Sequence, residues 1–364
     1  DTPDSPPNFK FVVDAFASKD TVKKESPLDL RINSILIRRG RMNYHVLSEE
    51  ETPGKFNAQH VQLQNIIASI SLKALNKDSV NLGIKRLSLD EKASGFSLKK
   101  LSLKLVANSR QTNIDNFAIE LPETSLRMDT IHLVYDSLQA FNHFAEQVRF
   151  SFRTLPSQIT LKDISPFVPA LSHFKEPVTL DMEVKGTVDQ LTCSQLEITA
   201  ADRQFRLRGD VSLQDLSHPQ DAYVYGTLSE LSANTRGVGF LVRNLSPNYN
   251  GVPPILERLG GVSFRGEISG YFADLVAYGQ LHTGLGNVKT DLKLSSDKSK
   301  GLFAYSGTVK TEDYKLGELL ANEQLGEITF NLDVHGRHIT DMFPVIELKG
   351  LIASVDYSRC QCRL

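Results

Sequence analysis

The stretch Val178–Leu191, VTLDMEVKGTVDQL, decides the fold, because its pattern returns twice downstream. The copies are VSFRGEISGYFADL at Val262–Leu275 and ITFNLDVHGRHITD at Ile328–Asp341. In all three, the first, third, fifth and seventh positions are apolar or Gly, and the positions between them are mostly polar. Such alternation is typical of a strand with one apolar face and one solvated face. The pattern therefore predicts a sheet-forming unit that is repeated along the chain.

Each copy carries a glycine at its ninth position, namely Gly186, Gly270 and Gly336. Glycine adopts positive φ angles at little steric cost, which other residues do not. We therefore expect the strand to turn sharply at each of these three positions.

A short helix is predicted shortly before each copy, within residues 163–174, 253–259 and 314–320. About four alternating runs separate one such helix from the next. The predicted unit is a short helix followed by about four strands, and two complete units fit before the sequence ends.

The first half of the sequence also alternates, but less regularly. Leu28, Leu30 and Ile32 share one parity whereas Ile35 and Ile37 take the other, and such a change predicts a β-bulge. Pairs of apolar residues recur at nearly constant steps between residues 87 and 133, which fits a meander or a β-solenoid. Residues 136–146, DSLQAFNHFAE, are predicted to form a short helix.

The domain organisation predicted from these patterns has four parts. Residues 1–8 form a Pro-rich, extended lead-in, residues 9–156 form a less regular β-groove portion, and residues 157–357 carry the regular repeats. Residues 358–364 break the pattern of everything before them, and we interpret this tail, which contains Cys360 and Cys362, as non-native or frayed.

Glycines recur in the middle of the apolar rows of the later strands. A mid-strand glycine marks a bend or the close approach of another group. If neighbouring strands are in register, these glycines form a line about which the sheet folds into a trough that is apolar inside. The glycines predicted to provide this curvature are Gly209, Gly226, Gly266, Gly279 and Gly307.

The apolar face of such a sheet must be covered. Each strand offers several inward side chains, each worth about 1.5–3 kcal/mol on burial, so exposing the whole face would cost more than the net stability of a domain. Three short helices cover only part of it. Either the two walls of the trough close on each other or an apolar ligand occupies the space between them.

The composition excludes several classes of function. A net charge of −2 over 364 residues, with no concentrated basic stretch, argues against a nucleic-acid-binding protein. The absence of Trp argues against a glycan-binding surface. No apolar run is long enough to span a bilayer as a helix. The sequence begins with Asp1 and shows no signal peptide, which suggests a portion of a longer protein.

We identify no catalytic, metal-binding or cofactor-binding residues in the sequence, and we expect a protein without enzymatic activity. The segment Arg236–Val242 begins like a dinucleotide-binding loop but has Val242 where the third glycine should stand. Three cysteines are too few and too scattered for a disulfide framework or a zinc site, and we expect Cys193 to be a small core residue.

Strands of the VTLDMEVKG and ITFNLDVHG type, preceded by helices of the DISPFVPAL or YKLGELL type, resemble the AsmA-like proteins, and most closely their TamB-type translocation and assembly modules of Bacteroidetes-type bacteria. The resemblance covers about residues 9–357. It implies a long, curved antiparallel sheet that forms a repeating, taco-shaped β-groove in the periplasm. It also implies an inner-membrane anchor and a partner, an outer-membrane barrel of the BamA type, which the full-length protein would contact through parts absent here.

The function implied by this resemblance is to conduct phospholipids between the inner and outer membranes and to support outer-membrane biogenesis. An alternative is a scaffold that assists the assembly of outer-membrane β-barrel proteins by pairing through its free strand edges. A phospholipid or another acyl-chain ligand would lie in the groove. The residues predicted to line it are Val178, Leu180, Met182, Val184, Phe205, Leu207, Val211, Val224, Val262, Phe264, Ile268, Leu281, Leu292, Phe303, Ile328, Phe330, Leu332 and Val334.

Overall fold

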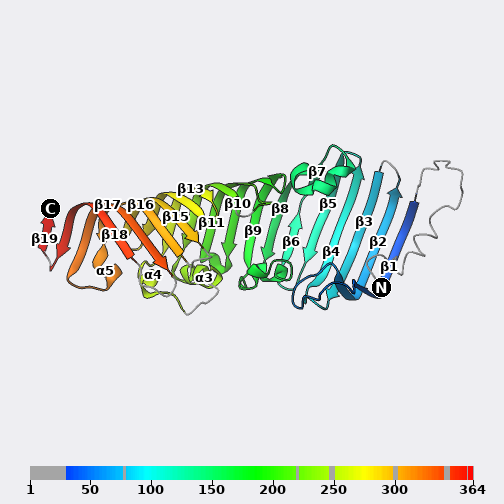
Figure 1. Cartoon of the computed structure of the whole chain (residues 1–364), viewed down its shortest axis with the longest axis horizontal. Coiled ribbons are helices and arrows are strands. Elements are labelled where there is room, and N and C mark those ends of the chain that lie inside the picture. Colours follow the sequence, from blue (N-terminus) through cyan, green and yellow to red (C-terminus); the bar gives the residue numbers. More distant parts are fainter. Residues whose placement is uncertain are drawn as a thin grey trace. The chain divides into compact units, whose positions relative to one another are not determined.

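The structure, a computed structural model, describes residues 30–76, 79–218, 221–245, 251–297, 302–339, 345–358 and 360–363. The predicted lead-in at 1–8 and the alternating run at 9–16 lie outside these residues. The fold is mainly β, with antiparallel strand pairing and a few short helices, which confirms the predicted fold class (Figure 1). None of the described helices is both long and apolar enough to span a bilayer.

The chain forms two compact units. The described residues of unit 1 lie within 30–132 and 161–172, and those of unit 2 within 133–160 and 173–363. The short strand β7 (Ile131–Val134) contains the point at which unit 1 gives way to unit 2. The sequence-based boundary at residue 156 describes where the regular repeats begin, and it stays a prediction.

Unit 1 is an antiparallel meander, in which each strand from β1 to β5 pairs with the next one along the chain. This decides between the two predicted arrangements in favour of the meander. The predicted bulge is confirmed, because the register of β1 against β2 shifts between Ile32 and Ile35. The strands are β1 (Leu30–His45), β2 (His60–Leu75), β3 (Ser79–Glu91), β4 (Ser97–Asn108), β5 (Gln111–Glu120) and β6 (Ser125–Met128).

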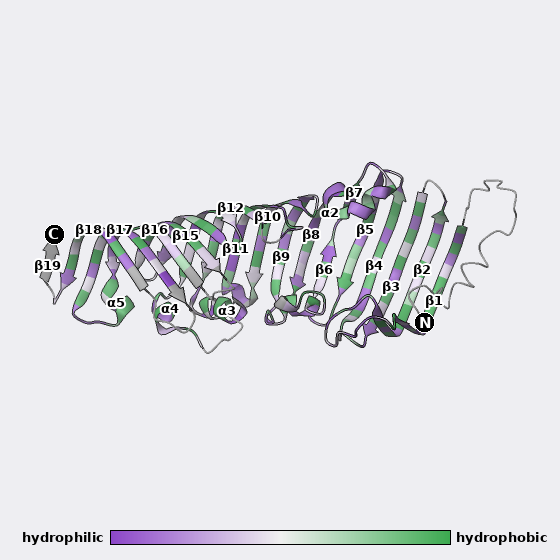
Figure 2. Cartoon of the chain, in the orientation of Figure 1, coloured by the Kyte–Doolittle hydropathy of each residue, from purple (hydrophilic) through white to green (hydrophobic). Residues whose placement is uncertain are grey.

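Unit 2 continues the same scheme, and each strand from β8 to β18 pairs antiparallel with its successor. Apolar and polar residues alternate along these strands (Figure 2). The strands are β8 (Arg149–Ile159), β9 (Val178–Gly186), β10 (Gln190–Ala200), β11 (Phe205–Gln214), β12 (Tyr223–Ala233), β13 (Val262–Tyr271), β14 (Asp274–Thr283), β15 (Gly286–Asp297), β16 (Leu302–Lys315), β17 (Leu325–Ile339), β18 (Val345–Tyr357) and β19 (Cys360–Arg363).

Most predicted helices are present. Residues 136–146 form η1 (Leu138–His143) and α2 (Phe144–Gln147), and the later two are α4 (Pro254–Arg258) and α5 (Leu316–Leu320). The single helix predicted over residues 163–174 is wrong. Two 3-10 turns, η2 (Leu161–Ile164) and η3 (Pro169–Leu171), stand there, because Pro169 lacks an N–H for a continuing helix and instead begins a new turn. Four strands, β9–β12, follow η3, and four more, β13–β16, separate α4 from α5, as predicted.

The sequence did not predict helix α3 (Thr235–Leu245), which follows β12. Asn234 precedes it, and its side-chain oxygen accepts a hydrogen bond from the backbone N–H of Gly237 at 2.9 Å. A side chain at Gly237 would collide with the backbone carbonyl of Gln204, so this glycine allows the helix to approach the sheet closely. Within Arg236–Val242, Gly237 therefore serves helix packing, and this segment forms a helix rather than a phosphate-binding loop.

Helices α3, α4 and α5 of unit 2 lie together beside the same ends of its strands, at the bottom of the view (Figure 1). Beneath α3, Val238 and Phe240 pack with Ala200, Phe205 and Ala233 in a buried cluster. Beneath α5, a second cluster consists of Leu285, Tyr314 and Ile328, with Leu316 and Leu319 packed against it. These two clusters are well-packed cores that cover the sheet beside these strand ends. A short 3-10 turn, η4 (Ala201–Arg203), joins β10 to β11.

The three glycines of the repeat behave differently. Gly186 and Gly270 have φ angles of 131° and 130°. Gly186 is the last residue of β9 and Gly270 precedes the last residue of β13, so both lie where the turn was predicted. Gly336 has no positive φ, and β17 continues past it to Ile339, so the sharp turn predicted at Gly336 is wrong. The ring of Tyr305 in β16 lies over Gly336, and a side chain there would collide with it. Gly336 therefore provides room for an aromatic ring.

Candidate ligand-binding face

One face of the unit 2 sheet carries nearly all of its alternating apolar residues, and we call it the inner face. Between the β-bulges, residues of neighbouring strands lie directly opposite each other, so the side chains form rows across the sheet. In one row, Leu231 of β12 lies opposite Phe264 of β13, which lies opposite Leu281 of β14, which lies opposite Val288 of β15. Such cross-strand neighbours are close enough to contact each other. The rows form an apolar surface that runs across many strands.

The predicted lining residues fall on this face. A second row joins residues of nine strands, β9 to β17, with Val184 opposite Cys193, Cys193 opposite Val211 and, beyond Gly226, Ile268 opposite Ala277. The same row continues through Leu292 and Gly307 to Val334. For Phe303 the backbone lies in β16, but its side chain is outside the described part of the structure. The remaining lining predictions on this face are Val178, Leu180, Met182, Phe205, Leu207, Val224, Val262, Phe264, Leu281, Ile328, Phe330 and Leu332.

Burial varies across the inner face. Next to the helices, Phe205 and Ile328 are only 7% exposed and belong to the two packed cores. In the middle of the strands, Phe264, Leu292 and Leu332 are neither buried nor fully exposed. The residues beside the helices thus form ordinary protein core. In the middle rows Val184 and Cys193 are also buried, whereas Phe264, Leu292 and Leu332 keep part of their apolar surface accessible.

The curvature glycines occupy two adjacent rows rather than the single line predicted. Gly266 and Gly279 lie directly opposite each other, and Gly209 shares their row, because it lies opposite Leu228, which in turn lies opposite Gly266. Gly226 and Gly307 belong to the neighbouring row. A side chain at Gly209, Gly266, Gly279 or Gly307 would collide with the backbone of the adjacent strand. Neighbouring backbones therefore approach closely where the glycines stand, as at a tight bend of the strands.

The opposite, outer face is polar. Arg208 of β11 donates to both carboxylate oxygens of Glu197 in β10, each at 3.0 Å, and lies 4.0 Å from Glu230 of β12. This pairing keeps the pKa of the Arg208 guanidinium above its ordinary value. A hollow of about 580 Å³ also opens on this face, and Arg265, Glu267, Tyr278 and Lys289 are among the residues that line it. Because these lining groups are charged or hydroxylic, the hollow is distinct from the predicted apolar groove.

Cys193 lies on the inner face, where it is 9% exposed, which confirms it as a small core residue. Burial raises the pKa of its thiol. A thiol of this kind is a poor nucleophile because little of it is ionised near neutral pH.

A cluster that the sequence analysis missed lies in unit 1, where His45, Glu51 and His60 bring their ligand atoms within 4.8 Å of one another. The signal was present in the sequence. His45 lies at the end of one strand, His60 at the start of the next, and Glu51 in the loop between them. These three residues come together if the two strands form a hairpin.

Comparison with known proteins leaves the resemblance described above as a prediction. Neither a protein-family model, nor a curated protein, nor a solved structure matches this chain.

Proposed function

We propose that this protein is a non-enzymatic lipid carrier, which holds acyl chains along the inner face of unit 2. The observation that carries the proposal is the row that joins Phe264, Leu281 and Val288 across neighbouring strands, in which all three side chains are partly exposed. An acyl chain is a linear apolar molecule, and a row of Leu, Val, Ile and Phe side chains offers it uninterrupted contact.

The energetics favour a ligand on these rows. Burying apolar surface is worth about 25 cal/mol per Å², so covering the exposed parts of several large side chains yields several kcal/mol. The polar outer face keeps the other side of the sheet in water. An occupant of the inner face would therefore be held mainly by apolar contact, which suits a carrier of lipids that differ in their head groups.

The fuller form of the proposal takes its cellular setting from the resemblance to TamB-type modules. In this form the protein lies in the periplasm, receives phospholipid from the inner membrane and passes it towards the outer membrane, where a BamA-type barrel is its partner. The repeated pattern of a short helix and about four strands over residues 157–357 supports this cellular location, because it is the basis of the resemblance.

The proposal is tested by extracting the purified protein with organic solvent and measuring phospholipid by mass spectrometry. We expect stoichiometric or greater amounts of phospholipid. Phe264→Glu, on the inner face, should lower the lipid content severalfold, because a buried carboxylate opposes an apolar ligand. Tyr278→Glu is the matched control, since Tyr278 lies on the neighbouring strand but is 61% exposed on the outer face. Lipid-free protein, or equal loss in both variants, would refute the proposal.

A second candidate function is supported by β1, the first strand of the unit 1 meander. It pairs with β2 along one edge, and its residues Leu36 and Ile37 are 64% and 38% exposed. Exposed apolar residues on a long strand favour pairing with a strand of another protein, and β1 is the first of the described strands. We therefore also propose a scaffold that holds client β-strands. Photo-crosslinking from position 36 should capture outer-membrane barrel proteins if this is correct, and the same crosslinker combined with Ile37→Pro should not.

A further inference from the structure

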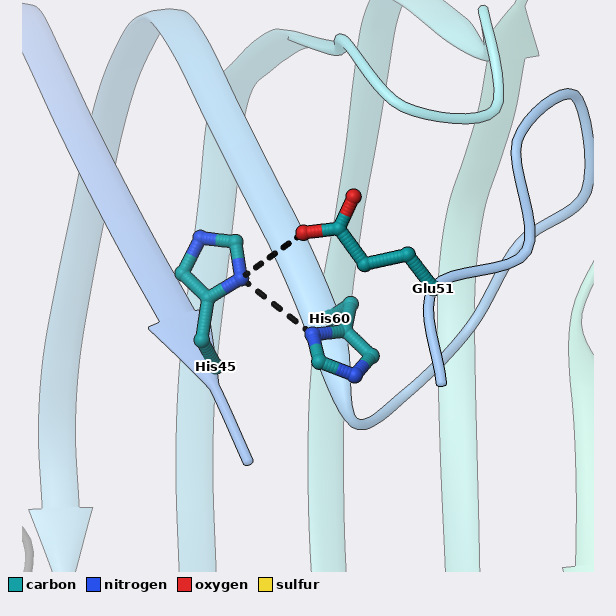
Figure 3. Close-up of side chains that lie close together, drawn as sticks. All are labelled: His45, Glu51 and His60. Atoms are coloured by element: carbon teal, nitrogen blue, oxygen red, sulfur yellow. Dashed lines mark hydrogen bonds and ion pairs between the residues drawn. The ribbon is translucent and has the colours of Figure 1, made fainter. Parts of the chain in front are cut away.

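The hairpin of β1 and β2 in unit 1 brings two imidazoles together. His45 ends β1 and His60 begins β2, and the two residues are direct cross-strand partners. Their Nδ1 atoms are 3.3 Å apart, and their ring centroids are 5.5 Å apart (Figure 3). Glu51, from the loop that joins the strands, places a carboxylate oxygen 4.0 Å from Nδ1 of His45. The three side chains thus converge from two strands and a loop.

The connecting loop is held by hydrogen bonds rather than left free. Within the loop, the Asn57 side chain donates to the carbonyl of Glu50 at 3.1 Å and accepts from the N–H of Gln59 at 2.9 Å. Further contacts tie the loop to the rest of unit 1, since the N–H of Gly54 donates to the carbonyl of Ala93 at 3.0 Å. The position of Glu51 near the imidazoles is therefore set by the fold of the hairpin loop.

The surroundings of His60 fix which of its nitrogens carries hydrogen. Its Nε2 lies 2.9 Å from the backbone carbonyl of Glu49, and a carbonyl only accepts, so Nε2 donates. In the neutral imidazole this leaves a lone pair on Nδ1, which is directed at Nδ1 of His45. A histidine that donates one ring N–H to a backbone carbonyl is oriented as metal-bound histidines are. His60 is 6% exposed, so its ring is held in place by packing.

The distances fit a tetrahedral ion. With bonds of about 2.0–2.1 Å from zinc to nitrogen or oxygen, two ligand atoms of a tetrahedron are about 3.4 Å apart. The Nδ1 atoms, 3.3 Å apart, already have this separation, and the carboxylate oxygen of Glu51, 4.0 Å from Nδ1 of His45, needs to move closer. Its side chain is 65% exposed, which leaves it free to do so. Two imidazoles and one carboxylate form a donor set that suits zinc and neighbouring transition metals better than magnesium or calcium.

We infer that His45, Glu51 and His60 bind one divalent transition-metal ion, with zinc as the best fit, and that the ion closes the β1–β2 hairpin of unit 1. Glu51 and His60 also line a hollow of about 180 Å³, which has room for a water molecule as the fourth ligand. Lys92 lines the same hollow and brings the one opposing positive charge among its lining residues. The inference is independent of lipid binding by unit 2.

The competing arrangement is a direct hydrogen bond in which Nδ1 of His45 donates to Nδ1 of His60, without any ion. The two alternatives make different predictions for added Zn²⁺. A hydrogen-bonded pair gains nothing from the ion, whereas a metal site is stabilised by the free energy of binding.

The test uses the full chain, stripped with a chelator and titrated with Zn²⁺ by isothermal titration calorimetry. We expect one ion per chain, a rise in melting temperature with Zn²⁺, and visible d–d absorption of a tetrahedral site when Co²⁺ replaces zinc. His45→Gln and Glu51→Gln each change a partly exposed side chain and should retain the fold. Each should weaken Zn²⁺ binding at least tenfold.

The matched control is His132→Gln, which removes another histidine of unit 1, one that interacts with Asn113 at 2.8 Å. It should leave Zn²⁺ affinity unchanged. Unaltered Zn²⁺ binding in His45→Gln and Glu51→Gln, or the absence of a stoichiometric site in the unmodified chain, would overturn the inference in favour of the hydrogen-bonded pair.

Discussion

Gly266 and Gly279 lie directly opposite each other in β13 and β14, and the ring of Phe264 lies over both. A Cβ atom added to either glycine would stand 2.9 or 2.8 Å from Cζ of that ring, and it would also collide with the backbone carbonyl of Tyr278 or Arg265. The absence of two side chains thus creates the space that an aromatic ring of the inner face occupies. Sheet curvature and the placement of Phe264 depend on the same pair of residues.

Gly279→Ala should therefore destabilise unit 2. The added methyl group meets backbone atoms, which cannot rotate away, and overpacking of this kind costs about 1–3 kcal/mol. The measurement is the free energy of unfolding by chemical denaturation. Gly226→Ala is the matched control, because a Cβ there first meets a side-chain carbon of Val211 at 3.4 Å, which is ordinary contact. Equal effects of the two substitutions would contradict this account.

Phe240→Ala should detach α3 from the sheet. Phe240 is 5% exposed and stacks on Phe205 with ring centroids 5.6 Å apart, so its removal leaves a cavity in the core beneath the helix. Truncation of a buried Phe costs about 3–5 kcal/mol. Hydrogen exchange should then show faster exchange of amides in α3. Phe272→Ala, which truncates a side chain that is 47% exposed, should change neither the exchange nor the stability by a comparable amount.

The strands were predictable because alternation is a local signal. In β9 and β13, the inner residues can be recognised because apolar residues recur at every second position. This pattern lies within the strand itself, so the partner strand need not be known. Helix α3 was not predictable in this way. Its glycines, Gly237 and Gly239, disfavour a helix when considered alone, and Gly237 is required only because the carbonyl of Gln204 lies against it. That contact comes from Gln204, just before β11, and cannot be read from the helix sequence.

The same distinction between local patterns and tertiary contacts applies to the residues of the candidate sites. Phe264 and Leu332 could be assigned to the inner face from parity alone. The extent of burial could not, since it depends on where the helices lie, and Phe205 and Ile328 belong to packed cores beneath α3 and α5. The approach of His45 to His60 depends on the register of β1 against β2, which a bulged strand conceals in the sequence.

Glu91 should make unit 1 sensitive to acid. Its side chain is only 2% exposed at the end of β3, and it accepts hydrogen bonds from the Ser94 hydroxyl and from the N–H groups of Gln62, Ala93 and Ser94. Burial acts to raise the pKa of this carboxyl, but the hydrogen bonds from Ser94 and the backbone outweigh burial, and the pKa lies below its ordinary value. The folded state therefore favours the carboxylate.

The lowered pKa of Glu91 determines how the stability of the protein depends on pH. A carboxyl with a lowered pKa in the folded state adds stability at a pH above its unfolded value, which is about 4.3. That contribution falls as the pH drops through the folded-state pKa. Glu91→Gln should thus reduce the melting temperature at pH 7 and lessen its further decline towards pH 3. Glu120→Gln, which removes a partly exposed carboxylate paired with Lys100, is the matched control and should lower the melting temperature at pH 7 by less than Glu91→Gln does.

Cys193 should resist alkylation in the folded protein. Two effects act together, because its thiol is 9% exposed on the inner face between Val184 and Val211, and because burial raises its pKa and so lowers the thiolate fraction. With iodoacetamide at pH 8, we expect modification at least tenfold slower in native buffer than in denaturant. Peptide mass spectrometry distinguishes Cys193 from Cys360 and Cys362, so each site is measured separately. Equal rates in both buffers would mean that the inner face opens to solvent around β10 far more often than its packing implies.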